Sequence, residues 1–580
     1  MGCGKMTNSN MKKYDYMLEQ NKNYMNSIAL STINRNITYE ELHESIEKYV
    51  KLLLKKGIRV GDMVGVCALN VPESVYLIYA LDIIGAVTIG FDPLASKEKL
   101  REYIELTKPK LIITVDLQYS NFRSLEKALN FSTIMYSITD SIADRKMQMG
   151  YQLMQLAHGN ITLSNARKLR KLLSKDYSNV DVIKSDYVED TLSDIMFTGG
   201  STGVNKGVEL SSNGINSVIE GMRYMYPSDF FTEKTYLGNI PFGHMAYGRA
   251  ILHVALTNNM NYALTLNALP KDFYSELVRT QAHCAVGGPP HWTSLIEQEN
   301  GVYVPRKDLK KGSLSNLQLA TSGGEAKKKS IESAINEALH YCGSSAEVGD
   351  GLGATENWSV MLLNSGYYYN PGTIGAPIST LDIKLIDPLT GEEVKHGEKG
   401  LLYISGPSTM LRYHNNPEET EKVMVYKDGK RWVNIGDYLR ETEKPNIYEY
   451  VGRQKRNFVS GIENIYPEIL EELISTLPEV REVVVTAIPD EIVQFIPRCH
   501  ISLNDGNIDI NQFEQKLEKL IVSKLTTSWL PGTIEYTTEP LKRMANSKFD
   551  ISYYQEQDRI LFESGKINNN KAKTLRLEKM

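Results

Sequence analysis

The strongest constraint on the fold is an alternation of short apolar runs with stretches of helical periodicity. Thr38 and Glu41 form a capping box, and apolar residues then recur at helical spacing from Leu42 to Leu53. Because helical stretches separate most of the apolar runs, we expect an α/β fold with largely parallel sheets. Strands are predicted at 64–69, 111–115, 195–197, 284–288, 317–322 and 346–350.

The pattern changes twice along the second half of the chain. From about residue 375 to about 450, short strands and turns such as LDIKLIDPLTGEEV predict a β-rich subdomain. After VGRQKRN, a helix–strand–strand–helix pattern predicts a small separate α+β domain. We therefore expect an N-terminal domain at 1–453, a C-terminal domain at 455–560 and a polar tail at 561–580. The irregular segment 140–190 predicts a solvated surface insertion with an exposed basic helix at 165–175.

Charge and cysteine content narrow the class of protein. The net charge of −5 gives no general basic field that would attract nucleic acid. The five cysteines are scattered, are odd in number and lack metal-binding spacing, which indicates a reducing compartment; Cys67 and Cys284 are predicted to be buried structural thiols. Residues 1–16 lack the apolar stretch of a secretory signal, and the apolar segment 76–91 contains Asp82 and predicts a buried helix and strand. We expect a cytoplasmic protein without a membrane span.

A loop at 198–208, TGGSTGVNKGV, follows the apolar run 192–197 directly. Its glycines leave backbone N–H groups accessible, its hydroxyls add hydrogen-bond donors, and Lys206 adds a positive charge. This combination predicts a nucleotide phosphate site. The loop does not match the Walker pattern of P-loop NTPases, because Asn205 and Gly207 flank the lysine.

The same loop resembles the signature T-S-G-[ST]-T-G-x-P-K-G of the adenylate-forming superfamily, which includes acyl-CoA synthetases, amino-acid adenylation domains and firefly-type luciferases. Blocks that resemble the other motifs of that superfamily follow in order, so that the resemblance covers about residues 35–555. These blocks are NIPFGHMAYG (239–248), SGGEA (322–326), GDGLGATE (349–356), NIGDYLR (434–440), VGRQKRNFVSGIENIYP (451–467) and EPLKRMANSKFD (539–550). The resemblance implies two α/β subdomains and a β-rich subdomain in the N-terminal domain, and a mobile C-terminal domain.

The chain departs from the superfamily's motifs at isolated positions. None of the changes in the loop removes its backbone donors or Lys206, and the loss of an aromatic at 352 replaces a stacking face for adenine by an apolar contact. The departures are Gly199 for Ser, Asn205 for Pro, Leu352 for an aromatic, Ile435 for Thr, Lys542 for Pro and Ser547 for Gly.

The resemblance implies a role for each matching residue toward ATP and Mg²⁺. The phosphates would be bound by Thr198, Gly199, Gly200, Ser201, Thr202, Gly203, Lys206 and Thr355. The adenine would lie against Gly323, Gly324, Glu325, Asp350 and Gly351, and the ribose against Asp437 and Arg453. Mg²⁺ would be held by Glu356 and Thr202, since carboxylate, hydroxyl and phosphate oxygens suit a hard cation.

The remaining implied roles concern the acid and the motion of the C-terminal domain. His244 and Phe242 would line the channel of the carboxylate substrate, and Lys548 would bridge the carboxylate and the α-phosphate. Lys455 would be the hinge between the domains, and Gly461 would line the approach of a thiol. The catalytic residues are therefore predicted to be Lys548, His244 and Glu356.

The reaction that the resemblance implies is activation of a carboxylic acid by ATP to acyl-AMP, with release of pyrophosphate, followed by transfer to CoA. The blocks GLGATENW and SGGEA are similar to those of aryl-CoA ligases. Trp292, within 287–295, either shortens the acid tunnel, which would favour an aromatic or a short to medium acid, or packs as an ordinary core residue.

Three alternatives remain beside the CoA ligase. A stand-alone ligase that loads an acyl carrier protein differs only in the acceptor. Adenylation of an amino acid is disfavoured, because PFGHMAYG contains no acidic residue to anchor an ammonium group. A non-catalytic nucleotide-binding regulator is disfavoured by the presence of Lys548, Glu356 and Asp437 together with the phosphate loop. The sequence does not indicate an oligomeric state.

Overall fold

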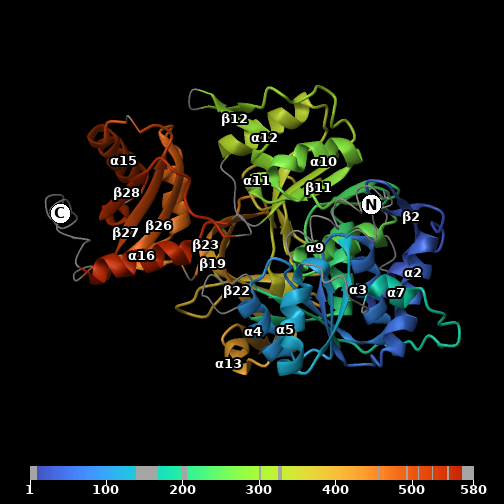
Figure 1. Cartoon of the computed structure of the whole chain (residues 1–580). Coiled ribbons are helices and arrows are strands. Elements are labelled where there is room, and N and C mark those ends of the chain that lie inside the picture. Colours follow the sequence, from blue (N-terminus) through green and yellow to red (C-terminus); the bar gives the residue numbers. More distant parts are fainter. Residues whose placement is uncertain are drawn as a thin grey trace.

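The computed structural model arranges the chain as a large part with two mainly parallel sheets, a β-rich part and a small C-terminal part (Figure 1). The described residues are 9–138, 168–198, 206–299, 302–323, 329–454, 456–460, 463–490, 494–506, 508–525, 527–544 and 548–564.

The first sheet has the strand order β20-β8-β7-β4-β3-β5-β6 within the described chain. Its strands are β3 Met63–Cys67, β4 Val87–Phe91, β5 Leu111–Val115, β6 Ser132–Tyr136, β7 Leu192–Phe197, β8 Gly207–Ser211 and β20 Arg412–Tyr413. The helices between them are α2 Tyr39–Lys55, α3 Pro72–Ile84, α4 Lys97–Thr107, α5 Tyr119–Leu129, α7 Leu169–Leu173 and α8 Ser212–Arg223. The strands β7, β4, β3, β5 and β6 are parallel, whereas β8 returns antiparallel to β7.

The second sheet has the order β17-β16-β15-β14-β11-β9-β10-β1-β2. Its strands are β1 Ile28–Ser31, β2 Asn36–Thr38, β9 Thr235–Gly238, β10 Asn261–Leu264, β11 Cys284–Gly287, β14 Leu319–Gly323, β15 Val348–Leu352, β16 Leu362–Leu363 and β17 Ala376–Pro377. The associated helices are α1 Lys13–Asn21, α9 Ala246–Thr257, α10 Phe273–Thr280, α11 Pro289–Thr293 and α12 Lys329–Tyr341, and β12 Ile296–Glu299 pairs with β13 Val302–Pro305. The strands from β15 to β1 are parallel, which confirms the predicted α/β class.

The β-rich part is a sheet with the order β18-β19-β22-β21 and with β23 on β22. Its elements are β18 Asp382–Ile386, β19 Lys399–Ser405, α13 Pro417–Glu421, β21 Met424–Lys427, β22 Lys430–Glu441 and β23 Tyr448–Arg453. The pairs between its strands are antiparallel, as the short turns of this region lead one to expect.

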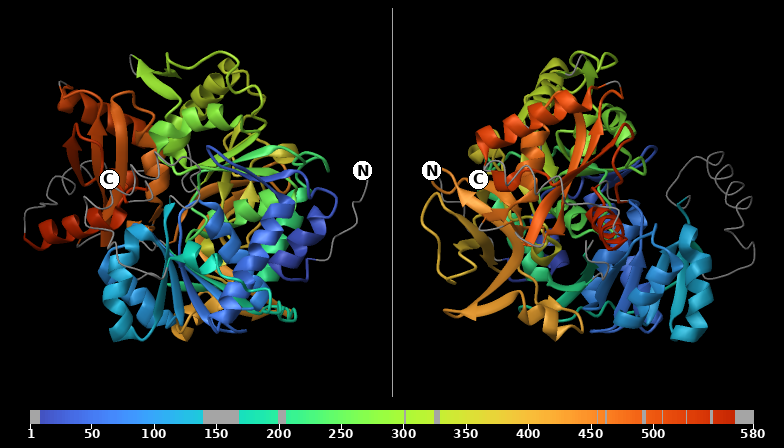
Figure 2. Two further views of the ribbon diagram at one scale, coloured as in Figure 1. Left: turned by 45° about the vertical axis from the view of Figure 1, so that its right-hand side comes forward. Right: turned by 90° about the vertical axis from the view of Figure 1, so that its left-hand side faces the viewer.

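The C-terminal part is an α+β unit that stands at one side of the molecule in Figure 1 and in the left view of Figure 2. Its elements are β24 Phe458–Ser460, β25 Glu463–Ile465, α14 Pro467–Ile474, β26 Val480–Asp490, β27 Gln494–Leu503, α15 Ile510–Lys524, β28 Thr533–Thr537 and α16 Ile551–Glu563. It has a hydrophobic cluster of its own, to which Leu401, Tyr438 and Val451 of the β-rich sheet contribute. We therefore propose that the domain boundary lies at 453–455, where the sequence places it.

Local sequence signals explain several of these elements. The capping box at the start of α2 is formed, because the Thr38 hydroxyl accepts from Glu41 N–H at 3.2 Å and the Glu41 carboxylate accepts from Thr38 N–H at 3.0 Å. The apolar segment 76–91 forms most of α3 and all of β4, and both are buried. Among the helices that the structure describes, none combines the length and apolarity needed to cross a bilayer.

The basic segment near residue 170 differs from the expected exposed helix. Only α7 is formed within the described residues, and its Leu169 and Leu172 are buried while Arg170 and Lys171 are exposed. The short helix therefore packs onto the large domain through one apolar face. The remainder of the predicted insertion, 140–167, lies outside the described residues.

The cysteines that the structure describes are free and buried, in agreement with a structural role. Burial raises the pKa of the Cys67 and Cys284 thiols to about 12. Both side chains therefore stay protonated and act as small apolar groups.

Candidate active site

The base of the predicted phosphate loop is an antiparallel hairpin between β7 and β8. Thr198 N–H donates to the Lys206 carbonyl at 3.0 Å, and Lys206 N–H donates to the Thr198 hydroxyl at 3.3 Å. The two residues therefore close the hairpin at the two ends of the predicted loop. Gly199, Gly200, Ser201, Thr202 and Gly203 lie outside the described residues, so their roles stay predictions.

Lys206 leads into a cluster of charged and aromatic side chains. Its ammonium pairs with Glu419 of α13 and lies 4.5 Å from the ring centroid of Tyr413. Tyr413 in turn donates its hydroxyl to the Glu356 carboxylate at 2.8 Å. The bond to Lys206, followed by one to Lys422, lowers the pKa of the Glu419 carboxyl to about 2. The cluster thus joins the phosphate hairpin to the predicted Mg²⁺ ligand.

Glu356 lies in a one-turn 3₁₀ helix, Thr355–Asn357, directly after the end of β15. Its carbonyl accepts from Met410 N–H at 2.7 Å, so its backbone is fixed from the β20 side. The chain then turns at Trp358, with φ 50°, and the indole N–H donates to the Ser211 carbonyl at 3.0 Å. The turn is tight: a β-carbon added at Gly353 would lie 1.9 Å from the Ser359 carbonyl oxygen.

Asp437 and Arg453 face each other across the β22–β23 pair. The Arg453 guanidinium donates to both carboxylate oxygens of Asp437, at 2.6 and 3.2 Å, and the Tyr450 hydroxyl donates to Oδ1 at 3.3 Å. Asp437 is 1 % exposed, whereas Arg453 is about half exposed. Asp437 holds the pKa of Arg453 well above its usual value, and Glu356 adds to this effect, so Arg453 lies within electrostatic reach of Glu356.

The predicted adenine side is formed where β14 and β15 end next to each other. Ser322 is paired with Asp350, and Gly323 with Gly351, in parallel register. Asp350 is buried. A β-carbon added at Gly323 would lie 3.6 Å from the ring of Tyr247, which therefore lies over this glycine. Gly324 and Glu325 lie outside the described residues.

His244 lies in the loop between β9 and α9, and this loop is pinned by a buried arginine. Arg249 donates to the carbonyls of Phe242 and Gly243, at 2.9 and 3.2 Å, and pairs with Asp194 of β7 at 2.8 Å. His244 Nε2 lies 3.7 Å from Asp92. Asp194, on the strand that leads to the phosphate loop, is therefore linked through Arg249 to the loop that carries His244.

The imidazole of His244 is neutral near pH 7. Burial lowers the pKa of His244, and the nearby Asp92 opposes this effect only in part. Its Nδ1 atom is buried and has no hydrogen-bond partner within the described part of the chain. A buried ring nitrogen without a partner can donate to or accept from a bound ligand, which supports the predicted role of His244 in substrate binding.

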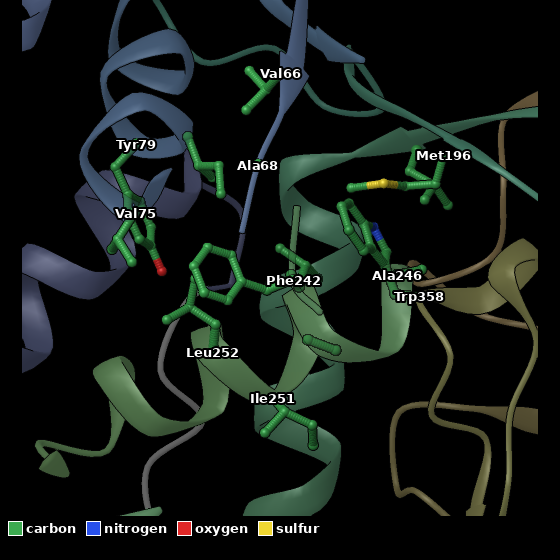
Figure 3. Close-up of a cluster of buried hydrophobic side chains, with 14 of the residues drawn as sticks. Val66, Ala68, Val75, Tyr79, Met196, Phe242, Ala246, Ile251, Leu252 and Trp358 are labelled. Atoms are coloured by element: carbon green, nitrogen blue, oxygen red, sulfur yellow. The ribbon is translucent and has the colours of Figure 1, made fainter. Parts of the chain in front are cut away.

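Two aromatic residues considered for the substrate channel, Phe242 and Trp292, belong to hydrophobic clusters. Figure 3 shows Phe242 among Val75, Tyr79 and Leu252, and its side chain is fully buried. The prediction that Phe242 lines the substrate channel is therefore wrong, because the pinned loop turns the ring inward. Trp292 is also fully buried and donates its indole N–H to the Thr321 carbonyl at 2.9 Å, so the core alternative holds for this residue.

Lys548 lies in the C-terminal part, in a short hairpin before α16, and its side chain is exposed. Lys455, Gly461 and Ser547 lie outside the described residues, and the hinge and thiol-approach roles stay predictions. The structure thus brings together Lys206, Glu356, Asp437 and Arg453 in one region and presents Lys548 on the separate C-terminal unit.

The sequence reasoning missed Tyr413, Glu419 and Tyr247. The segment RYHNNPEET (412–420) contains no glycine-rich or other recognisable ligand motif that would single out the first two. Only the pairing of β20 with β8, across about two hundred positions, brings them to Lys206. Tyr247 stands inside the quoted block PFGHMAYG, where its contact with Gly323 could have been considered.

Tyr413→Phe should raise the KM for MgATP roughly tenfold, because a hydrogen bond to a charged acceptor contributes about 1.5 kcal/mol and this one orients Glu356. Burial, followed by Glu356, raises the pKa of Tyr413, so the phenol stays a donor at neutral pH. Steady-state kinetics with varied MgATP would measure the effect, with the exposed Tyr426→Phe as control. An unchanged KM would show that Tyr413 does not orient the carboxylate.

The comparisons with known proteins agree with this geometry. Residues 17–414 match the family described as AMP-binding enzyme. The chain is 25 % identical to a long-chain-fatty-acid–CoA ligase of Bacillus subtilis, over 88 % of each chain. It is 26 % identical to luciferin 4-monooxygenase of Photuris pensylvanica, over 90 % of this chain and 91 % of the relative.

Solved structures share the fold over nearly the whole chain. The anthranilate CoA ligase AuaEII in complex with anthranoyl-AMP has a TM-score of 0.76 at 18 % identity, covering 95 % of this chain and 98 % of its own. ATP-bound MatB from Rhodopseudomonas palustris has a TM-score of 0.78 at 19 % identity, covering 95 % and 99 %. The sheets, the β-rich part and the C-terminal unit are therefore those of a known fold.

Proposed function

The chain belongs to the AMP-binding enzyme family, and from this premise we infer that it is an acid–thiol ligase. It activates a carboxylic acid with ATP to acyl-AMP, releasing pyrophosphate, and transfers the acyl group to CoA. The observation that carries this function is the cluster of Lys206, Tyr413, Glu356, Asp437 and Arg453. Lys206, Tyr413 and Glu356 are in contact at the phosphate hairpin, and the Asp437–Arg453 pair lies within electrostatic reach of Glu356.

The cluster suits the first half-reaction because that step holds two anions together. The attacking carboxylate is negative, and negative charge builds on the α-phosphate as pyrophosphate leaves. Lys206 supplies positive charge at the phosphate hairpin, where Glu419 and the Tyr413 ring hold its ammonium. The bidentate contact with Asp437 holds Arg453, whose expected partner is the ribose. Neutral His244 can meet the acid without carrying a competing charge.

The residues described fit a Mg²⁺ ion, since the Glu356 carboxylate is a hard oxygen ligand joined through Tyr413 to the phosphate hairpin. Thr202, the second predicted ligand, lies outside the described residues. Glu356 would hold the ion, which when bound neutralises charge on the phosphates. Tyr413 fixes the orientation of the carboxylate through its hydroxyl. The Glu356 carboxylate is therefore already oriented before the nucleotide binds.

The hinge that the second half-reaction needs is supported by two arginines that flank residue 455. Arg453 is bonded to Asp437 of the β-rich sheet. Arg456 is bonded instead to the C-terminal unit, to Glu468 at 3.2 Å and Glu471 at 2.5 Å. Backbone rotation between these anchors would remove Lys548 from the site and admit the thiol of CoA. Transfer to an acyl carrier protein is the alternative acceptor.

We place the substrate among compact acids, aromatic or of short to medium chain. Tyr247 stands three residues after His244 and lies over Gly323, so its ring fills space between the His244 loop and the end of β14. Burial raises the pKa of Tyr247, so its hydroxyl is neutral. A long acyl chain entering past His244 would meet this ring.

Tyr247→Ala should shift the preference toward longer acids. Each additional buried methylene contributes about 0.8 kcal/mol, so kcat/KM for an acid longer by two methylenes should rise about tenfold relative to the best short acid. Parallel kinetics on an acid series would measure the ratio, with the exposed Tyr224→Ala as control. A ratio that stays constant would show that Tyr247 does not limit the pocket.

The proposed function is tested by incubating the purified chain with ATP, Mg²⁺ and a panel of aromatic and aliphatic acids, with CoA, with a phosphopantetheinylated carrier protein, or with neither. We expect AMP and pyrophosphate with at least one acid, and the matching acyl-CoA by mass spectrometry. Acylated carrier protein without acyl-CoA would favour the alternative acceptor. No pyrophosphate with any acid would support a nucleotide-binding regulator.

A further inference from the structure

The hairpin that presents Lys548 is short and is held together by its own backbone. Arg543 and Phe549 form an antiparallel bridge, and Met544 N–H donates to the Lys548 carbonyl at 2.8 Å. The backbone of Lys548 is therefore fixed one residue before the bridge. The direction of its side chain depends on how this hairpin is seated on the C-terminal sheet.

Glu482 of β26 seats the incoming arm of the hairpin. Its carboxylate accepts from Leu541 N–H at 2.6 Å and from the Arg543 guanidinium at 3.0 Å. The guanidinium also lies 3.8 Å from the ring centroid of Phe549, on the outgoing arm. Glu482 is only 18 % exposed in its side chain. One carboxylate thus fixes both arms through Arg543.

Asp558 anchors helix α16, which directly follows the outgoing arm of the hairpin with Lys548 and Phe549. Its side chain is 2 % exposed and accepts from Arg498 Nε at 2.6 Å, and it also faces His500 Nε2 at 2.9 Å, both on β27. One turn earlier on the same helix, the Tyr554 hydroxyl accepts from Lys542 N–H at 2.7 Å. The helix that follows Lys548 is therefore bonded to the sheet and to the start of the hairpin.

The cluster around Asp558 is organised by an arginine rather than by a metal ion. His500, Glu535 and Asp558 offer ligand atoms within 4.8 Å of one another. However, Arg498 pairs with both carboxylates, at 3.0 Å to Glu535 and 2.6 Å to Asp558. The guanidinium already supplies the positive charge between them, so the cluster serves to anchor α16.

We propose that Glu482 and Asp558 are positioning residues for Lys548, acting in adenylation and not in thiol transfer. This inference rests on the proposed function, in which Lys548 bridges the acid and the α-phosphate. A misplacement of about 1 Å costs on the order of a hundredfold in rate when a reacting or bridging group must be oriented. In thiol transfer Lys548 has left the site, so its seating no longer matters.

The test measures the two half-reactions separately in full-length Glu482→Gln and Asp558→Asn. We expect acid-dependent pyrophosphate release to fall at least about tenfold in both variants, while acyl-CoA formation from supplied acyl-AMP stays within twofold of wild type. Glu482→Asp, which keeps the charge, should recover part of the lost rate. Glu479→Gln, which loses a pair with Lys516, and Glu556→Gln, on the exposed face of α16, are the matched controls.

Equal losses in both half-reactions, or no loss in either, would overturn the proposal. If Asp558→Asn fails to fold, as judged by its thermal melt, Glu482→Gln decides, because Glu482 and its partner Arg543 are both partly exposed, whereas Asp558 is buried. A wild-type chain that releases no pyrophosphate with any acid would count against the proposed function rather than against this seating of Lys548.

Discussion

Lys548→Ala is expected to lower the rate of acyl-AMP formation by about 10²–10³-fold, the scale for removing one preorganised group that stabilises developing charge. The lysine is exposed on a hairpin of the C-terminal unit, so its removal leaves no cavity in the core. The loss should therefore appear in catalysis without a change in the thermal melt. Acid-dependent pyrophosphate release measures it.

The same variant should convert supplied acyl-AMP and CoA to acyl-CoA at close to the wild-type rate. Under the proposed function the C-terminal domain rotates before that step, and the lysine would then no longer face the α-phosphate. Lys516→Ala, on α15 of the same domain, serves as a control for loss of a surface ammonium. Adenylation by Lys548→Ala at near the wild-type rate would show that another group bridges the carboxylate and the α-phosphate.

Asp194→Asn is expected to cost about 3–5 kcal/mol in the free energy of unfolding, because it leaves buried cations without their counter-ion. Asp194 lies on β7, is fully buried, and pairs with Lys13 of α1 and with Arg249 of α9 at 2.8 Å. Burial alone would raise the pKa of this carboxyl, but the charges of Lys13 and Arg249 hold it below its usual value.

The sign of the pH dependence follows from that lowered pKa. A carboxyl with a lower pKa in the folded state contributes its stability above its unfolded pKa of about 3.9, and this contribution is lost as the pH falls toward the folded value. Urea unfolding at pH 7 and in steps below pH 5 would measure both effects. Asp190→Asn loses a partly exposed pair with Arg431 but keeps an oxygen that can accept from Asn213, so it should cost less than about 1 kcal/mol.

A further consequence of the Asp194 network concerns the site. Arg249 uses its remaining donors on the carbonyls of Phe242 and Gly243, just before His244. Loss of Asp194 should therefore also raise the KM for the acid more than that for ATP. Wild-type unfolding free energy in Asp194→Asn would contradict the account of the network as a clamp between β7, α1 and α9.

The local sequence patterns predicted the helices and strands themselves more completely than they predicted which strands pair with each other. The runs at 64–69, 111–115 and 284–288 became β3, β5 and β11, and the capping box of α2 is formed. Each of these signals acts within a few residues. The edge position of β1 and β2, beside β10, required a pairing across more than two hundred residues, which periodicity does not encode.

In the candidate site, too, the residues within motifs could be predicted, whereas those brought together by strand pairing could not. Asp437 and Arg453 could be predicted from their motifs, and the β22–β23 register brings them into contact. Tyr413, Glu419 and Arg249 carry no local signal, because their roles arise only when distant strands pair. The prediction for Phe242 was wrong because a motif position does not indicate the direction of a side chain. Arg249 fixes the backbone of Phe242 so that its ring lies in the core.

The central claim is that this chain forms an acyl-AMP, and isotope exchange between pyrophosphate and ATP tests it most directly. With a suitable acid and Mg²⁺, and without CoA or carrier protein, radioactive pyrophosphate should enter ATP at a rate that depends on the acid and that Lys548→Ala lowers by about 10²-fold or more. Absence of exchange across the acid panel, or exchange of equal rate without any acid, would contradict the account.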